Sequence, residues 1–338
     1  MKEKKKIQIP GWLPGLFISS LVVVLLFQII DVEIFLNSLK SFKMQNHIIF
    51  AVLILLALLC RAAAWKFLIG DISLKDAFLI INEGYFFNNF IPRSGELARA
   101  FITSTISSQD AIEVFSSVVF ERAVDVIIAA VMFLITLPLA VSLTWIKPIA
   151  LVLVGGLILT IAAMLFIAVR SENIIRKIDL HKSEKQFFEK RILPIIRKLI
   201  QALSVLNKPK NILFAVIWIL FAWLIWTIML FYGIRLINPE APFWWSVFAE
   251  GVLALGIALP SAPAGLGVYE GAMVVALSTF GIRVDSALSL AIILHILQII
   301  ITSALGFFGL LLHGLTISNM LSKIREKFKN KKNGKMVL

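Results

Sequence analysis

The segment that decides the fold is 243–280, FWWSVFAEGVLALGIALPSAPAGLGVYEGAMVVALSTF. Each of its halves is apolar enough for a membrane helix, but its centre is interrupted by Pro260, Pro263, Gly265 and Gly267. Proline removes a backbone hydrogen-bond donor, and glycine weakens a helix. We therefore predict two half-helices joined by non-helical backbone, which is tolerated at membrane depth only inside protein or beside a wet cavity.

A second irregular segment lies at residues 76–92, with the sequence DAFLIINEGYFFNNFIP. It carries asparagines and a glutamate in an otherwise apolar run. The two segments share a pattern, because Glu83 precedes Pro92 by nine residues and Glu250 precedes Pro260 by ten. We interpret them as two related broken elements; chance similarity between two interrupted membrane segments is the alternative.

Further apolar runs are long enough to cross the hydrocarbon layer, which needs roughly 20 residues per helix. They lie at about 13–31, 47–69, 118–142, 148–169, 211–235 and 286–313. The whole chain is 59% hydrophobic and 16% charged, whereas soluble domains are about 45–50% apolar and about a quarter charged. Composition therefore excludes a soluble enzyme and predicts an all-α, polytopic membrane protein with six full spans and two broken elements.

The distribution of positive charge predicts the orientation of these spans. Most of the 33 Lys and Arg residues lie in three segments, 1–10, 170–210 and 318–338. Basic segments beside membrane spans stay in the cytoplasm, so we expect both termini and the central segment on that side of the plasma membrane. Counting spans from there, the two broken elements enter from opposite sides, the inverted-repeat pattern of a carrier with a site at mid-depth.

This topology gives the predicted organisation of the chain. Residues 1–169 form a first membrane half with a re-entrant element at 76–106, and residues 211–316 form a second half with a broken helix at 243–280. Between them, 170–210 is a basic amphipathic connector on the cytoplasmic face, and 317–338 is a basic cytoplasmic tail.

The first candidate site follows the first broken element. Arg93, Glu96 and Arg99 recur at intervals of three and therefore lie along one helix face. Ser94 is a predicted N-cap, and Glu96 lies in the first turn, where the helix dipole favours an anion. One interpretation is a pair of guanidinium groups that binds a phosphate, with Glu96 positioning an arginine. The alternative is an interfacial helix whose charges reach the lipid headgroups.

A second cluster lies near the start of a predicted span. Glu121, Arg122 and Asp125 can share one helix face, while the residues that follow carry no charge up to Leu139. Ionisable groups within a membrane are costly unless they are paired or hydrated. The cluster is therefore either a structural ion-pair network between helices or part of a site for a lipid headgroup or a proton relay.

The second broken element supplies further candidates. Its half-helix end, with Gly265 and Gly267, is predicted to offer free backbone amides to an anion. Glu270 follows this end, and Glu83, Glu250 and His295 are candidates for proton coupling. No histidine or cysteine has the spacing of a metal site, so neither a metal nor another cofactor is expected.

Three motifs of this sequence, in order, resemble the signatures of the lysylphosphatidylglycerol synthase transmembrane-region family of flippase-like proteins. They are Pro92-Arg93-Ser94-Gly95-Glu96-Leu97-x-Arg99-Ala100, Phe120-Glu121-Arg122-x-x-Asp125 and Leu259-Pro260-x-x-Pro263-x-Gly265-x-Gly267-x-x-Glu270. The sequence departs from the family at Ala262 and Ala264, where Thr and Gly are frequent, and at His295, where arginine is common. In the synthases this membrane part is a lipid flippase that precedes a cytoplasmic aminoacyl-transferase domain.

The resemblance implies a translocation module without synthase activity, because the sequence ends shortly after its last predicted span. We expect a protein that moves an anionic lipid, either a phospholipid or a polyprenyl-phosphate glycolipid, between leaflets. Its expected partners are membrane lipids, with a glycosyltransferase or lipid-modifying enzyme as a further candidate and no nucleic acid. The alternatives are a membrane-embedded lipid-head transferase with Glu96 or Asp125 as base, and a non-transporting partner of a glycosyltransferase.

Overall fold

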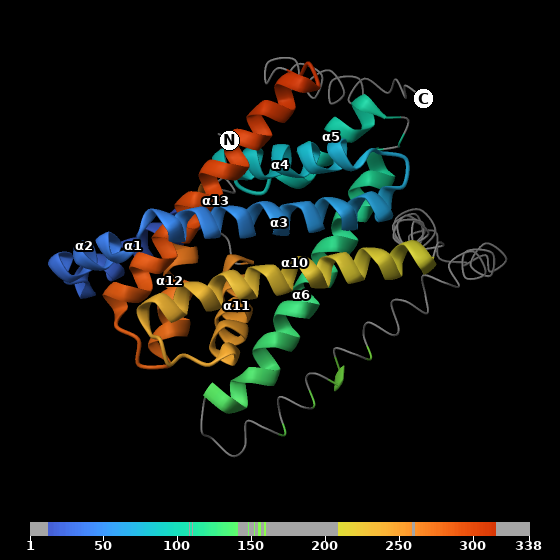
Figure 1. The fold of residues 1–338 in the computed structure, drawn as a ribbon. Coiled ribbons are helices and arrows are strands. Elements are labelled where there is room, and N and C mark those ends of the chain that lie inside the picture. Colours follow the sequence, from blue (N-terminus) through green and yellow to red (C-terminus); the bar gives the residue numbers. More distant parts are fainter. Residues whose placement is uncertain are drawn as a thin grey trace, which may run out of the picture.

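The computed structural model describes residues 13–107, 109, 111–140, 209–258 and 261–315, with isolated positions between 148 and 159. Every regular element in these ranges is helical (Figure 1). The elements are α1 (Leu13–Ile29), α2 (Val32–Ser41), α3 (Met44–Ile69), α4 (Leu74–Phe90), α5 (Gly95–Ile106), α6 (Ala111–Ala140), α10 (Pro209–Ile237), α11 (Phe243–Ile257), the short 3₁₀ turn η3 (Pro263–Gly265), α12 (Val268–Ser278) and α13 (Val284–Leu312). The predicted amphipathic connector before Pro209, the basic tail and Pro260 lie outside the described residues.

Four helices are long and apolar enough to cross a membrane. They are Met44–Ile69, Glu113–Ala140, Lys210–Ile237 and Val284–Leu312. Each overlaps a predicted span, and the chain is a multi-pass helical membrane protein. The predicted span at 13–31 corresponds to α1, an apolar helix of 17 residues, and the predicted span at 148–169 falls almost wholly outside the described residues.

The described helices form two sets that follow the same plan. In each set a long helix is followed by a medium, a short and another long helix: α3, α4, α5 and α6, then α10, α11, α12 and α13. The packing also corresponds, because α3 packs on α10, α4 packs on α13 of the other set, and α11 packs on α6. The two sets of described helices therefore correspond in order, relative length and packing.

The two sets run in opposite directions. Phe50, near the start of α3, packs against Tyr232, near the end of α10, with ring centroids 5.6 Å apart. Phe67, near the end of α3, stacks on Phe214, near the start of α10, at 5.2 Å. The two helices are thus antiparallel neighbours, as the blue and yellow helices in Figure 1 show.

Both predicted broken elements are interrupted, at equivalent points. The second ends its first helix at Ile257 and resumes at Val268. The first differs from expectation, because α4 runs unbroken through its asparagines and glutamate, and the interruption follows at residues 91–94. The non-glycine residues with positive φ in the described chain are Arg93 (58°) and Ala264 (59°), each directly after a proline. The two tips therefore share one local backbone geometry.

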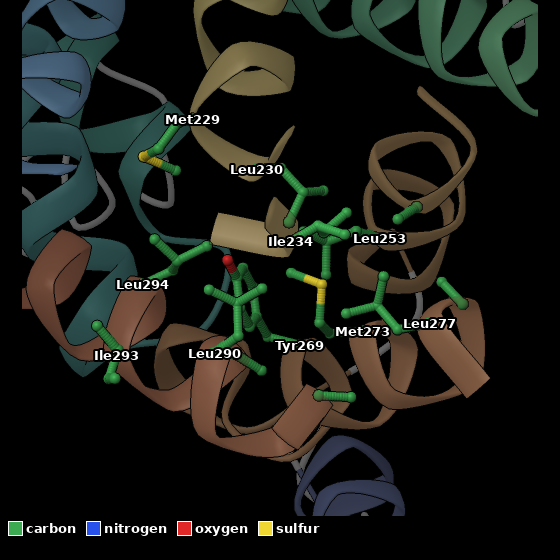
Figure 2. Packing of buried hydrophobic residues seen from close by; sticks show 14 of the residues in the cluster. Met229, Leu230, Ile234, Leu253, Tyr269, Met273, Leu277, Leu290, Ile293 and Leu294 are labelled. Atoms are coloured by element: carbon green, nitrogen blue, oxygen red, sulfur yellow. The ribbon is translucent and has the colours of Figure 1, made fainter. Parts of the chain in front are cut away.

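The largest apolar core joins the helices of the second set. Figure 2 shows its members pointing toward one another from all four helices: Met229, Leu230 and Ile234 from α10, Leu253 from α11, Tyr269, Met273 and Leu277 from α12, and Leu290, Ile293 and Leu294 from α13. Burying an aliphatic side chain contributes about 1.5–3 kcal/mol. This core fixes α12 against α13 and thereby positions the tip of the second broken element.

Candidate functional site

A cavity of about 430 Å³ lies between the two sets of helices. Its lining comes from α3, α4, α5, α6, α10, α11, α12 and α13 and from both interrupted tips. Arg61, Asp125, Trp223 and His295 each lie toward the middle of a long helix. The cavity is therefore at mid-height of the bundle, where polar side chains in a membrane protein mark a functional site.

The cavity is bounded by a buried network of arginines and carboxylates. Arg61 binds Asp125 through two parallel hydrogen bonds of 2.8 and 2.9 Å and Glu121 through a third of 3.1 Å. The indole N–H of Trp223 also donates to Asp125, at 2.9 Å. Two-pronged arginine–carboxylate bonds fix orientation as well as charge, so α3, α6 and α10 are locked together at this depth.

Two more arginines complete this network, which has three guanidinium groups and two carboxylates. Arg99 donates to Glu121 at 2.7 Å, and its guanidinium carbon lies 4.3 Å from the ring centroid of Trp65. Arg122 is 3.1 Å from Glu121 and 3.5 Å from Asp125. The network of Arg61, Arg99, Arg122, Glu121 and Asp125 therefore holds one positive charge in excess.

The three arginines differ in how far they can reach a ligand. The side chain of Arg122 is 40% exposed and lines the cavity, whereas those of Arg61 and Arg99 are 9% and 6% exposed. The Nε–H of each is buried without a hydrogen-bond acceptor in the described part of the chain. Of these three arginines, Arg122 is the one that an anion in the cavity would contact first.

Arg93 joins the two interrupted tips. Its Nη2 donates to the carbonyl oxygen of Ala258, at the end of α11, at 3.0 Å, and it lines the cavity together with Glu96. Ser94 was predicted to cap α5 with its side chain. It lies at the N-cap position, but its hydroxyl donates to the Ile91 carbonyl and makes no hydrogen bond to α5. Arg93 precedes α5, so it does not share a helix face with Arg99.

The second tip is closed by a hydrogen-bonded chain. Glu270 accepts a 2.7 Å bond from the backbone N–H of Gly267 and is 2.6 Å from Nδ1 of His295. Nε2 of His295 lies 3.0 Å from the carbonyl oxygen of Ala264, and the ring of Tyr269 stacks on the imidazole. His295 lines the cavity, while Glu270 holds this histidine and the start of α12 in position.

The second tip was predicted to offer free backbone amides. This prediction is wrong for Ala262, Gly265 and Gly267, because their N–H groups donate hydrogen bonds within the described chain. The N–H of Ala262 donates to the hydroxyl of Ser19 on α1 at 2.8 Å, and the N–H of Gly265 donates to the Ala262 carbonyl at 2.9 Å. The N–H of Gly267 is taken by Glu270, as described above.

Other lining residues add carboxyl and amide groups and apolar surface to the cavity. Glu96 and Glu250 line it with carboxyl groups that make no hydrogen bond to any described residue, and Asn89 and Gln298 add amides. The lining also includes apolar side chains, among them Trp226, Met229 and Leu230 of α10. The cavity can therefore hold a phosphate beside hydroxyl or amino groups, with an apolar chain against these apolar side chains.

The sequence-based site is thus divided by the structure. The predicted residues that line the cavity are Arg93, Glu96, Arg122, Asp125, Gly265, Glu250 and His295. Those that lie beside it in supporting positions are Arg99, Glu121, Pro263, Gly267 and Glu270. Glu83 is separate, because it is fully buried between α4 and α13. Pro260 lies outside the described residues.

Sequence reasoning missed Arg61 and His313. Arg61 interrupts an apolar run between residues 47 and 65, and an isolated charge in a predicted span is a signal that could have identified it. His313 lacks such a signal, since its partner Glu83 is 230 residues away in the sequence.

Comparison with known proteins identifies one family. The family model described as lysylphosphatidylglycerol synthase TM region matches residues 12–306. No curated protein sequence and no solved structure gives a significant match.

Proposed function

The chain belongs to the lysylphosphatidylglycerol synthase transmembrane-region family, and from this premise we propose that it moves an anionic lipid between the leaflets of the plasma membrane. The substrate class is a phospholipid or a polyprenyl-phosphate glycolipid. The observation that carries the proposal is the mid-height cavity, whose lining combines the exposed guanidinium group of Arg122 with apolar side chains of α10 and α11. A lipid headgroup and the start of its chains have this same combination of charge and apolar surface.

The lining residues support distinct roles in binding the lipid. Arg122, Arg93 and Arg61 are the candidates for phosphate contacts, and Glu121 and Asp125 keep the guanidinium groups in place. Glu96 and Glu250 are suited to hydroxyl or amino groups of the headgroup. Such paired contacts compensate the cost of moving a phosphate away from water.

The antiparallel sets support the proposed topology. The α3–α4 loop and the end of α13 meet at one end of the bundle, where Asp76 is 3.6 Å from His313. The start of α2 and the start of α13 meet at the other, where Asp31 N–H donates to Asp285. This agrees with a cytoplasmic C-terminus and with two broken elements that enter from opposite sides, the plan of carriers that open alternately to each face.

A membrane-embedded transferase is less well supported. Such an enzyme would need a free base, but Asp125 accepts hydrogen bonds from Arg61 and Trp223 and is also paired with Arg122. These donors occupy the carboxylate oxygens of Asp125, so it is not a free base. Glu96 lacks these bonds and remains the candidate base. A transferase that used Glu96 would convert the lipid chemically, whereas a carrier returns the lipid unchanged.

The proposal is tested by lipid movement in proteoliposomes. A fluorescent anionic phospholipid in both leaflets is bleached from outside, and the fraction that becomes accessible is followed over time. Wild-type protein should make the inner pool accessible, and Arg122→Gln should reduce the rate at least about tenfold, as expected for the loss of one charged hydrogen bond. Arg283→Gln removes an exposed arginine outside the cavity and should leave the rate unchanged. Equal rates for empty and wild-type vesicles would contradict the proposal.

A further inference from the structure

Glu83 forms a second polar centre, away from the arginine network. Its carboxyl group lies fully buried between α4 and α13. One carboxyl oxygen, Oε1, is 2.7 Å from Nδ1 of His313. The other, Oε2, is buried without a hydrogen bond in the described part of the chain. A buried carboxyl with an empty acceptor position is costly as an anion and is readily occupied by a proton.

Asp76 and His313 connect this carboxyl to the surface. Nε2 of His313 lies 3.6 Å from Oδ1 of Asp76 and makes no hydrogen bond to a described residue. Asp76 is 40% exposed and lies in the first turn of α4, where its other oxygen accepts from the Ser73 hydroxyl. An exposed carboxylate, an imidazole and a buried carboxyl thus stand in sequence from solvent to interior.

The charged and titratable groups around Glu83 come from three elements. Asp76 is on its own helix, and His313 follows the last residue of α13. Arg99 on α5 lies beside Gly84, where an added Cβ would be 2.8 Å from its side chain, but its guanidinium group is directed to Glu121. The charge of Glu83 is therefore balanced mainly by His313.

The surface of α13 that holds His313 also reaches the cavity. A stripe of polar and small residues recurs along it at intervals of three and four, the spacing of one helix face. Its members are His295, Gln298, Thr302, Gly306, Gly309 and His313. The first three line the cavity, and Asn89 of α4 donates to Thr302 at 3.1 Å. Figure 1 shows α13 crossing the whole bundle and passing α4.

The glycines of the stripe bring α4 against α13. An added Cβ at Gly309 would be 2.7 Å from Oε1 of Glu83, and one at Gly306 would overlap the Asn82 backbone. Because the helices touch here, any sliding of α4 along α13 changes the surroundings of Glu83. The protonation state of Glu83 and the relative position of these two helices are therefore linked.

We propose that Glu83 is a proton-binding site, loaded from solution through Asp76 and His313, and that it couples lipid movement to a proton gradient. This inference rests on the proposed function. A proton taken up from water by the exposed carboxylate of Asp76 passes to the free Nε2 of a neutral His313 protonated on Nδ1, giving the imidazolium and restoring the Asp76 carboxylate. The imidazolium then passes its Nδ1 proton to Oε1 of Glu83. The products are a neutral carboxylic acid and a neutral histidine protonated on Nε2.

Infrared difference spectra test the proton site without any lipid substrate. Spectra of purified protein are recorded between about pH 5 and about pH 8, the range in which a histidine-linked site titrates. Wild-type protein should gain the absorbance of buried protonated carboxyls at low pH, and Glu83→Gln should lose the contribution of one carboxyl to this band. Asp71→Asn removes an exposed carboxyl from the neighbouring α3–α4 loop and should retain the band. An identical band in Glu83→Gln protein would overturn the site.

A second variant keeps this test decisive if Glu83→Gln folds poorly. His313→Gln retains a hydrogen-bonding group beside Glu83 but cannot carry a proton at these pH values. The carboxyl band should shift in this variant, because the hydrogen bond to Oε1 changes. An unshifted band would show that the titrating carboxyl is not the partner of His313 and would overturn the proposal.

Coupling is tested with the same proteoliposomes under an imposed pH gradient. The wild-type rate should change by up to about tenfold per pH unit, the steepest slope that one proton gives. The rate of Glu83→Gln protein should not respond to the gradient. A gradient response that persists in Glu83→Gln, or a wild-type rate without any response, would overturn the coupling. Absence of all lipid movement by wild-type protein would instead contradict the proposed function and leave the infrared result standing.

Discussion

Arg99 and Arg122 are of the same residue type and bind the same carboxylate, but they differ in their access to the cavity. Both bind Glu121, and both occur in motifs of charged residues at helical spacing. Arg99 is enclosed by Glu121 and Trp65, whereas much of the Arg122 side chain is exposed to the cavity. The difference comes from neighbours distant in sequence. Spacing predicted that these arginines matter, and only the three-dimensional contacts divide them into a supporting and a ligand-facing residue.

The pairing of Arg61 gives the first prediction at this scale. Arg61→Gln leaves Asp125 and Glu121 buried with fewer donors, and breaking a buried ion pair costs about 3–5 kcal/mol. Thermal unfolding in detergent should therefore occur at a clearly lower temperature. Adding Asp125→Asn removes the carboxylate that lost its two-pronged partner, so this second substitution should cost less in the Arg61→Gln background than it costs alone. Losses that simply add in the double variant would contradict the assigned pairing.

At the scale of elements, the broken helix was predictable and its chemistry was not. Proline and glycine mark the interruption at 260–267 directly, because they cannot sustain a helix. Free amides were expected at the same place, but Ser19 of α1 and Glu270 occupy them. α4 was expected to be irregular, yet Asn82 and Glu83 fit within a helix because the Phe78 carbonyl and His313 bond their side chains. Both partners become visible only in the folded chain.

Two glycines provide a matched test of the second tip. Gly265 and Gly281 have positive φ values of 82° and 73°, and an added Cβ at either meets no atom within 4 Å. Leucine at either position should cost about 1–2 kcal/mol through backbone strain. Gly265 lines the cavity and Gly281 does not. Lipid movement per folded molecule should therefore fall in Gly265→Leu and stay normal in Gly281→Leu, as measured in proteoliposomes with protein content determined after detergent extraction.

An equal effect of the two leucines on specific activity would remove this tip from the site. Gly267 is less informative, because its added Cβ would be 2.7 Å from the backbone of Ser19. A substitution there would displace α1 before it altered the cavity.

At the scale of the whole molecule, much of the plan could be predicted from the sequence. Apolar runs indicated the four long helices, and the shared spacing of Glu83 with Pro92 and Glu250 with Pro260 indicated two related elements. The equivalence of the two sets and their antiparallel packing agree with that prediction. The cavity could not be predicted in the same way, because it arises where residues from both halves meet, such as Arg61 with Asp125 and Arg93 with Ala258.

We propose that one cavity serves both leaflets in turn. Labelling of a single cysteine in this cavity is a direct test. Ser261 lines the cavity, and Cys60, the sole cysteine, is buried. In a Cys60→Ser background, Ser261→Cys is treated with a membrane-impermeant thiol reagent from each side of sealed vesicles, and Asn37→Cys serves as the control for a site at one end.

The cysteine at position 261 should react from both sides, and more slowly when the vesicles contain anionic lipid. The cysteine at position 37 should react from one side only. Reaction at position 261 from a single side, with or without anionic lipid, would contradict the account.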